Sequence, residues 1–199
     1  MPASSKVMEA GLSAAGPVRD DRDLVSRARA GDRTAFGELV RLYQDRVFNT
    51  CLRIIGDRQT AEDLTQEAFI KAHASIERFD GRAAFFTWLY RIAVNLCLSA
   101  RRVKRPMNAL DNGGVALRLT DGGTSPSALA DRREQYGAVL AALAELDEEH
   151  RAVVVLRDIE SLDYSEIGEI LGVPTGTVKS RLHRGRMALR ERLKHLMEG

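Results

Sequence analysis

The chain has 199 residues, of which 44% are hydrophobic, 6% aromatic and 29% charged, and its formal net charge is only +2. This length allows one domain or two small ones, and the dominance of Leu, Ala, Arg and Glu favours an all-α fold. No apolar run approaches the roughly 18–20 residues that span a bilayer, and the N-terminus lacks the apolar core of a signal peptide. We therefore expect a cytoplasmic protein without membrane insertion.

The N-terminal half of the chain predicts a mobile tail followed by a helical domain. Residues 1–21 are rich in Ala, Ser, Gly and Pro without a period, and a first domain is expected over residues 22–105. Gly56-Asp57 is predicted to end one helix and start another, residues 79–82 form a loop, and Pro106 stops the last helix. The three main amphipathic helices are expected over Thr34–Ile55, Ala61–Ala74 and Ala83–Arg105.

The second of these helices carries an acidic surface. Asp63, Gln66 and Glu67 fall on adjacent turns of one helical face. Such a patch can meet a basic protein partner. Equally, Glu62 and Asp63 can support the helix dipole if they lie near the N-terminus of the helix. Charge alone leaves these two interpretations even.

The last helix of the first domain contains four large aromatic side chains, Phe85, Phe86, Trp88 and Tyr90, and ends in a basic run. Aromatic rings beside cations can stack unpaired bases. Core packing is the favoured interpretation for Phe85, Trp88 and Leu89. The preceding loop, together with the polar side chains of Arg82 and Asn95, offers the better candidate contacts with nucleic acid.

Residues 106–131 change character, because Pro, Asn, Gly, Asp, Ser and Thr dominate them, and they predict a flexible linker between two domains. A second domain is expected over residues 132–199, beginning with helices over Arg132–Leu146 and Glu148–Arg157. The β-branched run Val153–Val155 predicts a buried helical turn rather than a strand. In the first domain, Cys51 and Cys97 lack metal-ligand spacing, and reduced core thiols are favoured over a redox switch.

The segment from Asp163 onward predicts a helix-turn-helix, the layout of a DNA-binding unit. Asp163 can cap a short helix, and Glu166 three residues later can complete a capping box. Gly172 suits the left-handed residue that ends a helix, and Pro174 prevents its continuation.

The second helix of this unit is expected to start at a threonine cap, Thr175 or Thr177, and to bury Val178 and Leu182. Residues 175–199 contain seven Lys or Arg and two Glu, a local net charge of +5. This focused charge is typical of a nucleic-acid-binding surface, although a solvated basic helix is the alternative. The candidate DNA contacts are Thr177, Lys179, Ser180, Arg181, His183, Arg184 and Arg186.

Three segments together resemble the extracytoplasmic-function (group IV) sigma factors of bacterial RNA polymerase, members of the sigma-70 family similar to sigma-E. They are Ala61–Ala72 (AEDLTQEAFIKA), Phe85–Asn95 (FFTWLYRIAVN) and Tyr164–Arg181, which contains YSEI and GTVKSR. The resemblance implies two small helical domains joined by a flexible linker, sigma-2 over residues 22–105 and sigma-4, with the helix-turn-helix, over residues 132–199.

The resemblance also implies partners and contacts. Asp63, Gln66 and Glu67 would face the clamp helices of the largest polymerase subunit, and sigma-4 would bind the polymerase flap. The basic C-terminal helix would contact the −35 promoter element. The −10 element, with a flipped base, would contact Phe79, Asp80, Gly81, Arg82 and Asn95. An anti-sigma factor is an expected partner, whereas no cofactor, metal or catalytic residue is expected.

Other classes of function explain less of the sequence. A stand-alone helix-turn-helix regulator would leave the acidic patch and the aromatic helix without a role, and residues 22–105 show no ligand-site signature. An anti-sigma mimic that binds polymerase without DNA would not need the basic helix. An enzyme is disfavoured because no catalytic motif is present. The four histidines are scattered: His73, His150, His183 and His195.

Overall fold

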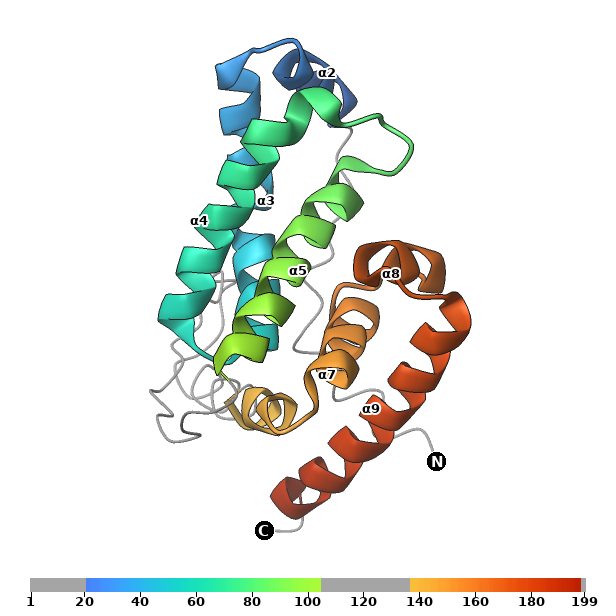
Figure 1. Ribbon diagram of the computed structural model, residues 1–199. Coiled ribbons are helices and arrows are strands. Elements are labelled where there is room, and N and C mark those ends of the chain that lie inside the picture. The colour runs from blue at the N-terminus through green and yellow to red at the C-terminus, as the bar shows by residue number, and fades with distance from the viewer. Residues whose placement is uncertain (1–20, 105–136, 198–199) are drawn as a thin grey trace, which may run out of the picture.

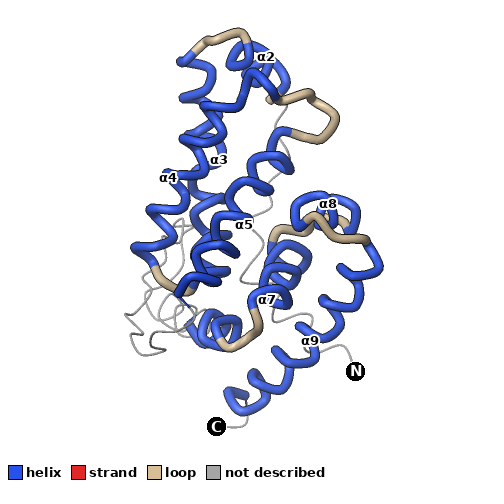
Figure 2. The backbone as a smooth tube through the Cα atoms, viewed as in Figure 1, coloured by secondary structure: helices blue, strands red, loops and turns tan. Residues whose placement is uncertain are grey.

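The computed structural model describes residues 21–104 and 137–197, and every regular element in these two ranges is helical (Figure 2). This confirms the predicted all-α fold. Almost all of the predicted tail and all of the predicted linker over 106–131 lie outside the described residues. Within the described ranges, no helix has both the length and the apolar character needed to cross a bilayer.

The first domain is a helical bundle in which α3, α4 and α5 pack against one another (Figure 1). Its elements are α2 (Arg22–Arg29), α3 (Arg33–Ile55), α4 (Arg58–Ser75), the 3-10 turn η1 (Ile76–Arg78) and α5 (Phe85–Lys104). The three long helices start and end within three residues of the positions that the sequence predicts.

The junction between α3 and α4 forms as the residues Gly56-Asp57 predict. Gly56 ends α3 in the left-handed region, with φ of 81°, which a residue without a side chain adopts at little cost. The Asp57 side chain then accepts a hydrogen bond from the backbone N–H of Thr60 at 2.8 Å. This cap lets α4 begin at Arg58, three residues earlier than expected.

The second domain contains the helix-turn-helix. Its elements are a helical stretch over residues 137–144, α7 (Glu148–Val154), the π-helical turn η2 (Val155–Ile159), α8 (Tyr164–Leu171) and α9 (Thr175–Met197). The predicted helix over Glu148–Arg157 is therefore α-helical only to Val154. The run Val153–Val155 is fully buried, which confirms the predicted buried turn.

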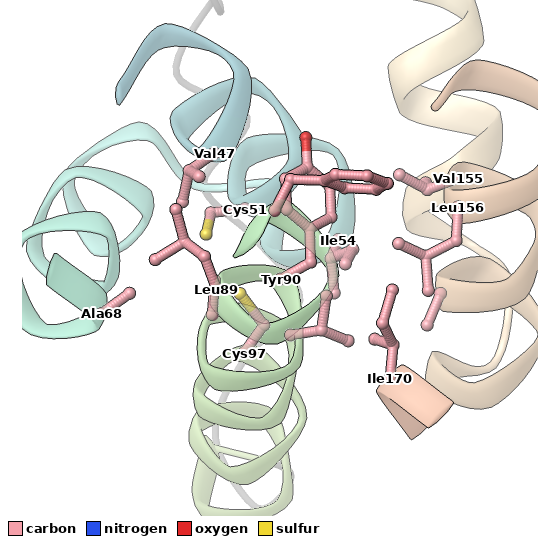
Figure 3. Close-up of a cluster of buried hydrophobic side chains, with 14 of the residues drawn as sticks. Val47, Cys51, Ile54, Ala68, Leu89, Tyr90, Cys97, Val155, Leu156 and Ile170 are labelled. Atoms are coloured by element: carbon pink, nitrogen blue, oxygen red, sulfur yellow. The ribbon is translucent and has the colours of Figure 1, made fainter. Parts of the chain in front are cut away.

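The two domains pack directly against each other, with α8 on α5 and η2 on α3 (Figure 1). Their buried apolar side chains form one continuous cluster, part of which Figure 3 shows: Val47, Ile54, Leu89 and Tyr90 from the first domain with Val155, Leu156 and Ile170 from the second. Cys51 and Cys97 lie inside this core as buried free thiols, in agreement with the favoured interpretation.

Candidate nucleic-acid interface

The acidic surface on α4 is exposed to solvent. Asp63, Gln66 and Glu67 are all exposed, at a spacing that places their side chains on one helical face. Because α4 begins at Arg58, Asp63 lies beyond the first turn, where the interaction with the helix dipole has fallen off. Dipole support therefore does not explain this patch, and a role in binding a partner is the better interpretation.

An apolar side chain on the same face was missed by sequence reasoning. Ile70 lies seven residues after Asp63, and it is 68% exposed. It neighbours Glu67, whose carboxylate pairs with Lys71 at 2.8 Å. An exposed isoleucine among carboxylates suits a protein partner, since the carboxylates repel nucleic-acid phosphates. The signal available in the sequence was the spacing of seven residues between Asp63 and Ile70, which places both side chains on one helical face.

The loop after η1 is anchored by a buried aromatic ring. Phe79 is only 5% exposed, and its ring centroid lies 5.9 Å from that of Phe85 and 5.1 Å from that of Trp88. Phe85 and Leu89 are likewise buried, as the core interpretation predicted, whereas Trp88 is only half-buried. Phe79 was predicted as a DNA contact, but its ring packs inside the bundle and holds the loop in place.

Three loop residues that were predicted as DNA contacts are exposed, namely Asp80, Gly81 and Arg82. The Asp80 carboxylate accepts a hydrogen bond from the backbone N–H of Arg82 at 3.0 Å and pairs with the Arg82 guanidinium at 3.3 Å. Gly81 has φ of 74°, a left-handed conformation that favours glycine. The turn thus projects the Arg82 side chain, which is 90% exposed, into solvent.

A cavity of about 270 Å³ lies between this loop, α5 and α8. Its polar lining includes Arg82, Thr87 and Arg91 from the first domain and Glu169 from α8, and Trp88 forms part of its apolar wall. The predicted contact Asn95 lies one turn beyond Arg91 on the same face of α5, and both are exposed. Sequence reasoning missed Arg91, although its spacing of four from Asn95 was visible.

The helix-turn-helix begins as the sequence predicts. The Asp163 side chain accepts hydrogen bonds from the backbone N–H groups of Ser165 (2.7 Å) and Glu166 (2.8 Å), and the Glu166 carboxylate accepts one from Asp163 N–H (2.8 Å). This confirms the predicted capping box. Gly172 ends α8 with φ of 66°, in the left-handed region, also as expected.

The predicted threonine cap of α9 is wrong. The helix begins at Thr175, and the backbone N–H of Val178 donates to the carbonyl of Pro174 at 3.1 Å. Pro174 therefore occupies the position before the first turn, which places both Thr175 and Thr177 inside the helix. Proline is tolerated at a helix start because the N–H that it lacks has no intrahelical partner there.

The outward face of α9 is polar and basic. Val178 and Leu182 are buried, as predicted, and fix which side of the helix faces the domain. Of the seven predicted DNA contacts, Thr177 and Arg181 are half-buried. The other five are exposed: Lys179, Ser180, His183, Arg184 and Arg186.

Two of the three arginines on α9 that were predicted as DNA contacts are held by carboxylates of their own domain. Arg181 pairs with Glu149 of α7 at 2.5 Å, and Arg186 donates through Nε to Asp158 of η2 at 3.0 Å. These pairs orient both guanidinium groups. Arg184, which lies between Arg181 and Arg186 in the sequence, is exposed. Arg184 is therefore the most direct probe of a DNA-binding role for this face.

A glycine on α9 sets how closely this helix approaches α7. A Cβ at Gly185 would lie 2.7 Å from Val154 Cγ2 and 3.1 Å from the His150 carbonyl oxygen. We expect Gly185→Ala to lower the free energy of unfolding by about 1–3 kcal/mol through overpacking, as measured by urea denaturation. Gly176→Ala on the same helix is the control, because its Cβ would meet nothing within 4 Å. Equal stability of the two variants would show that α7 and α9 are not this closely packed.

Each of the two domains matches a known protein family. Residues 39–106 match the family described as Sigma-70 region 2, and residues 136–189 match Sigma-70, region 4. The chain is 38% identical to the "ECF RNA polymerase sigma factor SigW" of Bacillus subtilis over 179 residues, which cover 86% of this chain and 96% of that protein. It is 42% identical over 174 residues, 84% of this chain and 66% of that protein, to the "ECF RNA polymerase sigma factor SigE" of Mycolicibacterium smegmatis.

Solved structures share the fold. The structure of CnrH in complex with the cytosolic domain of CnrY superposes with a TM-score of 0.65 at 23% identity, over 88% of this chain and 97% of that one. The sigma factor RpoE in complex with the anti-sigma factor NepR, from Bartonella quintana, gives a TM-score of 0.64 at 24% identity, over 80% of this chain and 96% of that one.

Proposed function

The chain belongs to the extracytoplasmic-function sigma factors of RNA polymerase, and we propose that its two domains divide promoter recognition between them. It acts as an alternative sigma factor that binds core RNA polymerase and directs transcription initiation. The observation that carries the proposed division is the presence of two candidate DNA surfaces of different chemistry. One is the basic face of α9, and the other is the loop and α5 around the cavity.

The sigma-4 domain is proposed to read the −35 element. The buried Val178 and Leu182 direct the opposite face of α9 outward, where Lys179 and Arg184 can reach phosphates and base edges in the major groove. Each bidentate contact between an arginine and a guanine contributes roughly 1–3 kcal/mol of discrimination. Thr177, Ser180, His183 and the two paired arginines complete the proposed surface.

The sigma-2 domain is proposed to capture unpaired bases of the −10 element. A flipped base needs an aromatic wall and polar groups that offset an unstacking cost of a few kcal/mol. The cavity of about 270 Å³ supplies Trp88 as that wall, with Arg82 and Arg91 as cations for the adjoining phosphates. Asp80, Gly81 and Asn95 border this surface, and Phe79 supports it from inside.

Protein partners are assigned to the remaining surfaces. The face of α4 with Asp63, Gln66, Glu67 and Ile70 is proposed to bind the clamp helices of the largest polymerase subunit, while sigma-4 binds the flap. An anti-sigma factor that covers these faces is the proposed regulator, since the sigma factor RpoE, which shares the fold, was solved in complex with the anti-sigma factor NepR. The proposed site of action is the cytoplasm, where the polymerase works.

Arg184→Ala tests the role of α9. We expect this change to slow initiation by about 5- to 150-fold on a promoter with an intact −35 element, because a contact of about 1–3 kcal/mol is lost. On a promoter with a scrambled −35 element the same variant should match the wild type. Initiation rates of reconstituted holoenzyme measure both, with the exposed Arg190→Ala as control. An equal loss on both promoters would contradict a −35 role.

A further inference from the structure

Glu160 is a buried carboxylate in the segment between η2 and α8 of sigma-4, and its side chain is only 4% exposed. The local backbone is unusual. The Glu160 N–H donates to the Val155 carbonyl at 3.0 Å, which is the spacing of a π-helical turn, and Ser161 has φ of 60°. Both conformations are rare, and π-helical turns are frequent at functional positions.

The Glu160 carboxylate is bound by four side chains of the sigma-2 domain. They are Arg46 (2.9 Å), Thr50 (2.8 Å), Arg53 (3.4 Å) and Tyr90 (3.0 Å), and together with Glu160 they form what we call the Glu160 latch. Burial raises the pKa of Tyr90 well above its ordinary value, so the phenol stays protonated and donates its hydrogen bond. Two cations and two hydroxyls thus satisfy one buried charge.

A second polar contact joins the domains at the end of α3. The carbonyl oxygen of Ile54 accepts hydrogen bonds from Arg151 of α7 at 2.7 Å and from Arg101 of α5 at 3.0 Å. Arg101 in turn lies 3.7 Å from the carboxylate of Glu148 in sigma-4. Tyr90 of the latch and Ile54 of this second contact also belong to the apolar cluster that the domains share (Figure 3).

The closed arrangement brings sigma-4 onto the proposed −10 surface. Glu169 of α8 lines the same cavity as Arg82 and Arg91, so that in the closed arrangement its carboxylate would compete with DNA phosphates for these cations. The −35 and −10 elements are about 25 base pairs apart, or roughly 85 Å of B-DNA at about 3.4 Å per base pair. Because α8 touches the −10 cavity, the closed chain cannot occupy both elements at once.

We propose that the Glu160 latch holds the free chain in an autoinhibited closed state, and that engagement of core polymerase requires the latch to break. This inference rests on the proposed division of promoter recognition. A latch of buried charges suits a reversible closure, because opening rehydrates the separated carboxylate and guanidinium groups. Burial of ions costs so much solvation that such contacts give specific positioning with modest net stability.

The first measurement is the distance between the two domains in the full chain. Gln44→Cys on α3 and Arg190→Cys on α9 introduce exposed thiols for a Förster donor and acceptor, while Cys51 and Cys97 are buried and stay unlabelled. Glu160→Gln and Arg46→Gln weaken the latch from opposite domains. Glu145→Gln is the matched control, because it removes an ion pair of 2.9 Å with Arg192 inside sigma-4.

We expect at least a tenfold larger open fraction in both latch variants than in the wild type, with no change in the control. The rate of association with core polymerase should rise at least threefold in the same two variants. Circular dichroism verifies folding, and Arg46→Gln decides the question if Glu160→Gln unfolds. The proposal would be overturned if a folded latch variant showed the same energy transfer as the wild type. It would also be overturned if the domains separated in a latch variant but its association with core polymerase were no faster.

The two proposals fail in distinguishable ways. If the wild-type chain did not support transcription on any promoter, the proposed division of promoter recognition would fall. The energy-transfer result would still report whether Glu160 closes the chain. If transcription succeeded but both folded latch variants remained as closed as the wild type, the latch alone would be refuted.

Discussion

Arg151→Met is expected to lower the free energy of unfolding by at least about 2 kcal/mol. Arg151 is fully buried, and its guanidinium donates to the carbonyl oxygens of Ala144, Leu146 (3.0 Å) and Ile54 (2.7 Å). Methionine has a similar length but no donor, so the carbonyls of Ala144 and Leu146 lose this hydrogen bond, whereas that of Ile54 keeps the one from Arg101. Each buried group left unsatisfied costs about 1–3 kcal/mol. Such a loss is large beside the total stability of about 5–15 kcal/mol that is usual for a protein.

Urea denaturation followed by circular dichroism measures this effect. The control is Arg190→Met on α9, where an exposed arginine changes to the same residue and a shift within about 0.5 kcal/mol is expected. A loss below about 1 kcal/mol for Arg151→Met would mean that the carbonyls of Ala144 and Leu146 find other donors. Because Ile54 belongs to sigma-2, the substitution should also weaken the contact between the domains.

Asp63→Arg is expected to reduce the affinity for core RNA polymerase at least tenfold. The side chain lies on the exposed face of α4 with Gln66, Glu67 and Ile70, and it contributes little to the core of the bundle. If this face meets basic clamp helices, reversal of the charge replaces an attraction with a repulsion. Like charges placed across an interface cost several kcal/mol.

Equilibrium binding of labelled chain to core polymerase measures that affinity. Glu38→Arg on α3 provides a control with the same change of charge on an exposed acidic residue of the same domain. Equal losses in both variants would indicate a general electrostatic effect rather than a local contact. Unchanged affinity in Asp63→Arg would remove α4 from the polymerase interface, and Ile70→Ala would then also be expected to have no effect.

Local signals in the sequence predict much of the fold. The aspartate-glutamate pair at the start of α8, the glycine at its end and the Gly56-Asp57 junction each specify a boundary through contacts within a few residues, and the structure forms all three. The buried side of α9 follows from the periodicity of Val178 and Leu182 in the same way. The cap of α9 was predicted wrongly, because two threonines closely follow the proline that precedes the helix.

Features that depend on distant residues could not be predicted. Phe79 is buried by rings from α5. The Glu160 carboxylate is hydrogen-bonded by residues of α3 and α5 that lie 70 to 114 positions away in the sequence. The helix propensities of the residues do not predict the π-helical turn before Glu160. The cavity likewise combines a loop with Glu169 of the other domain, a contact that no spacing in the sequence encodes.

Run-off transcription with purified core polymerase, with and without this chain, tests the central claim most directly. The templates are a library of genomic promoter fragments. Transcripts that depend on the chain are expected, and their upstream sequences should align into one −35 and one −10 element. Absence of such transcripts, with the chain nonetheless bound to duplex DNA in the absence of polymerase, would contradict the account and favour a stand-alone regulator.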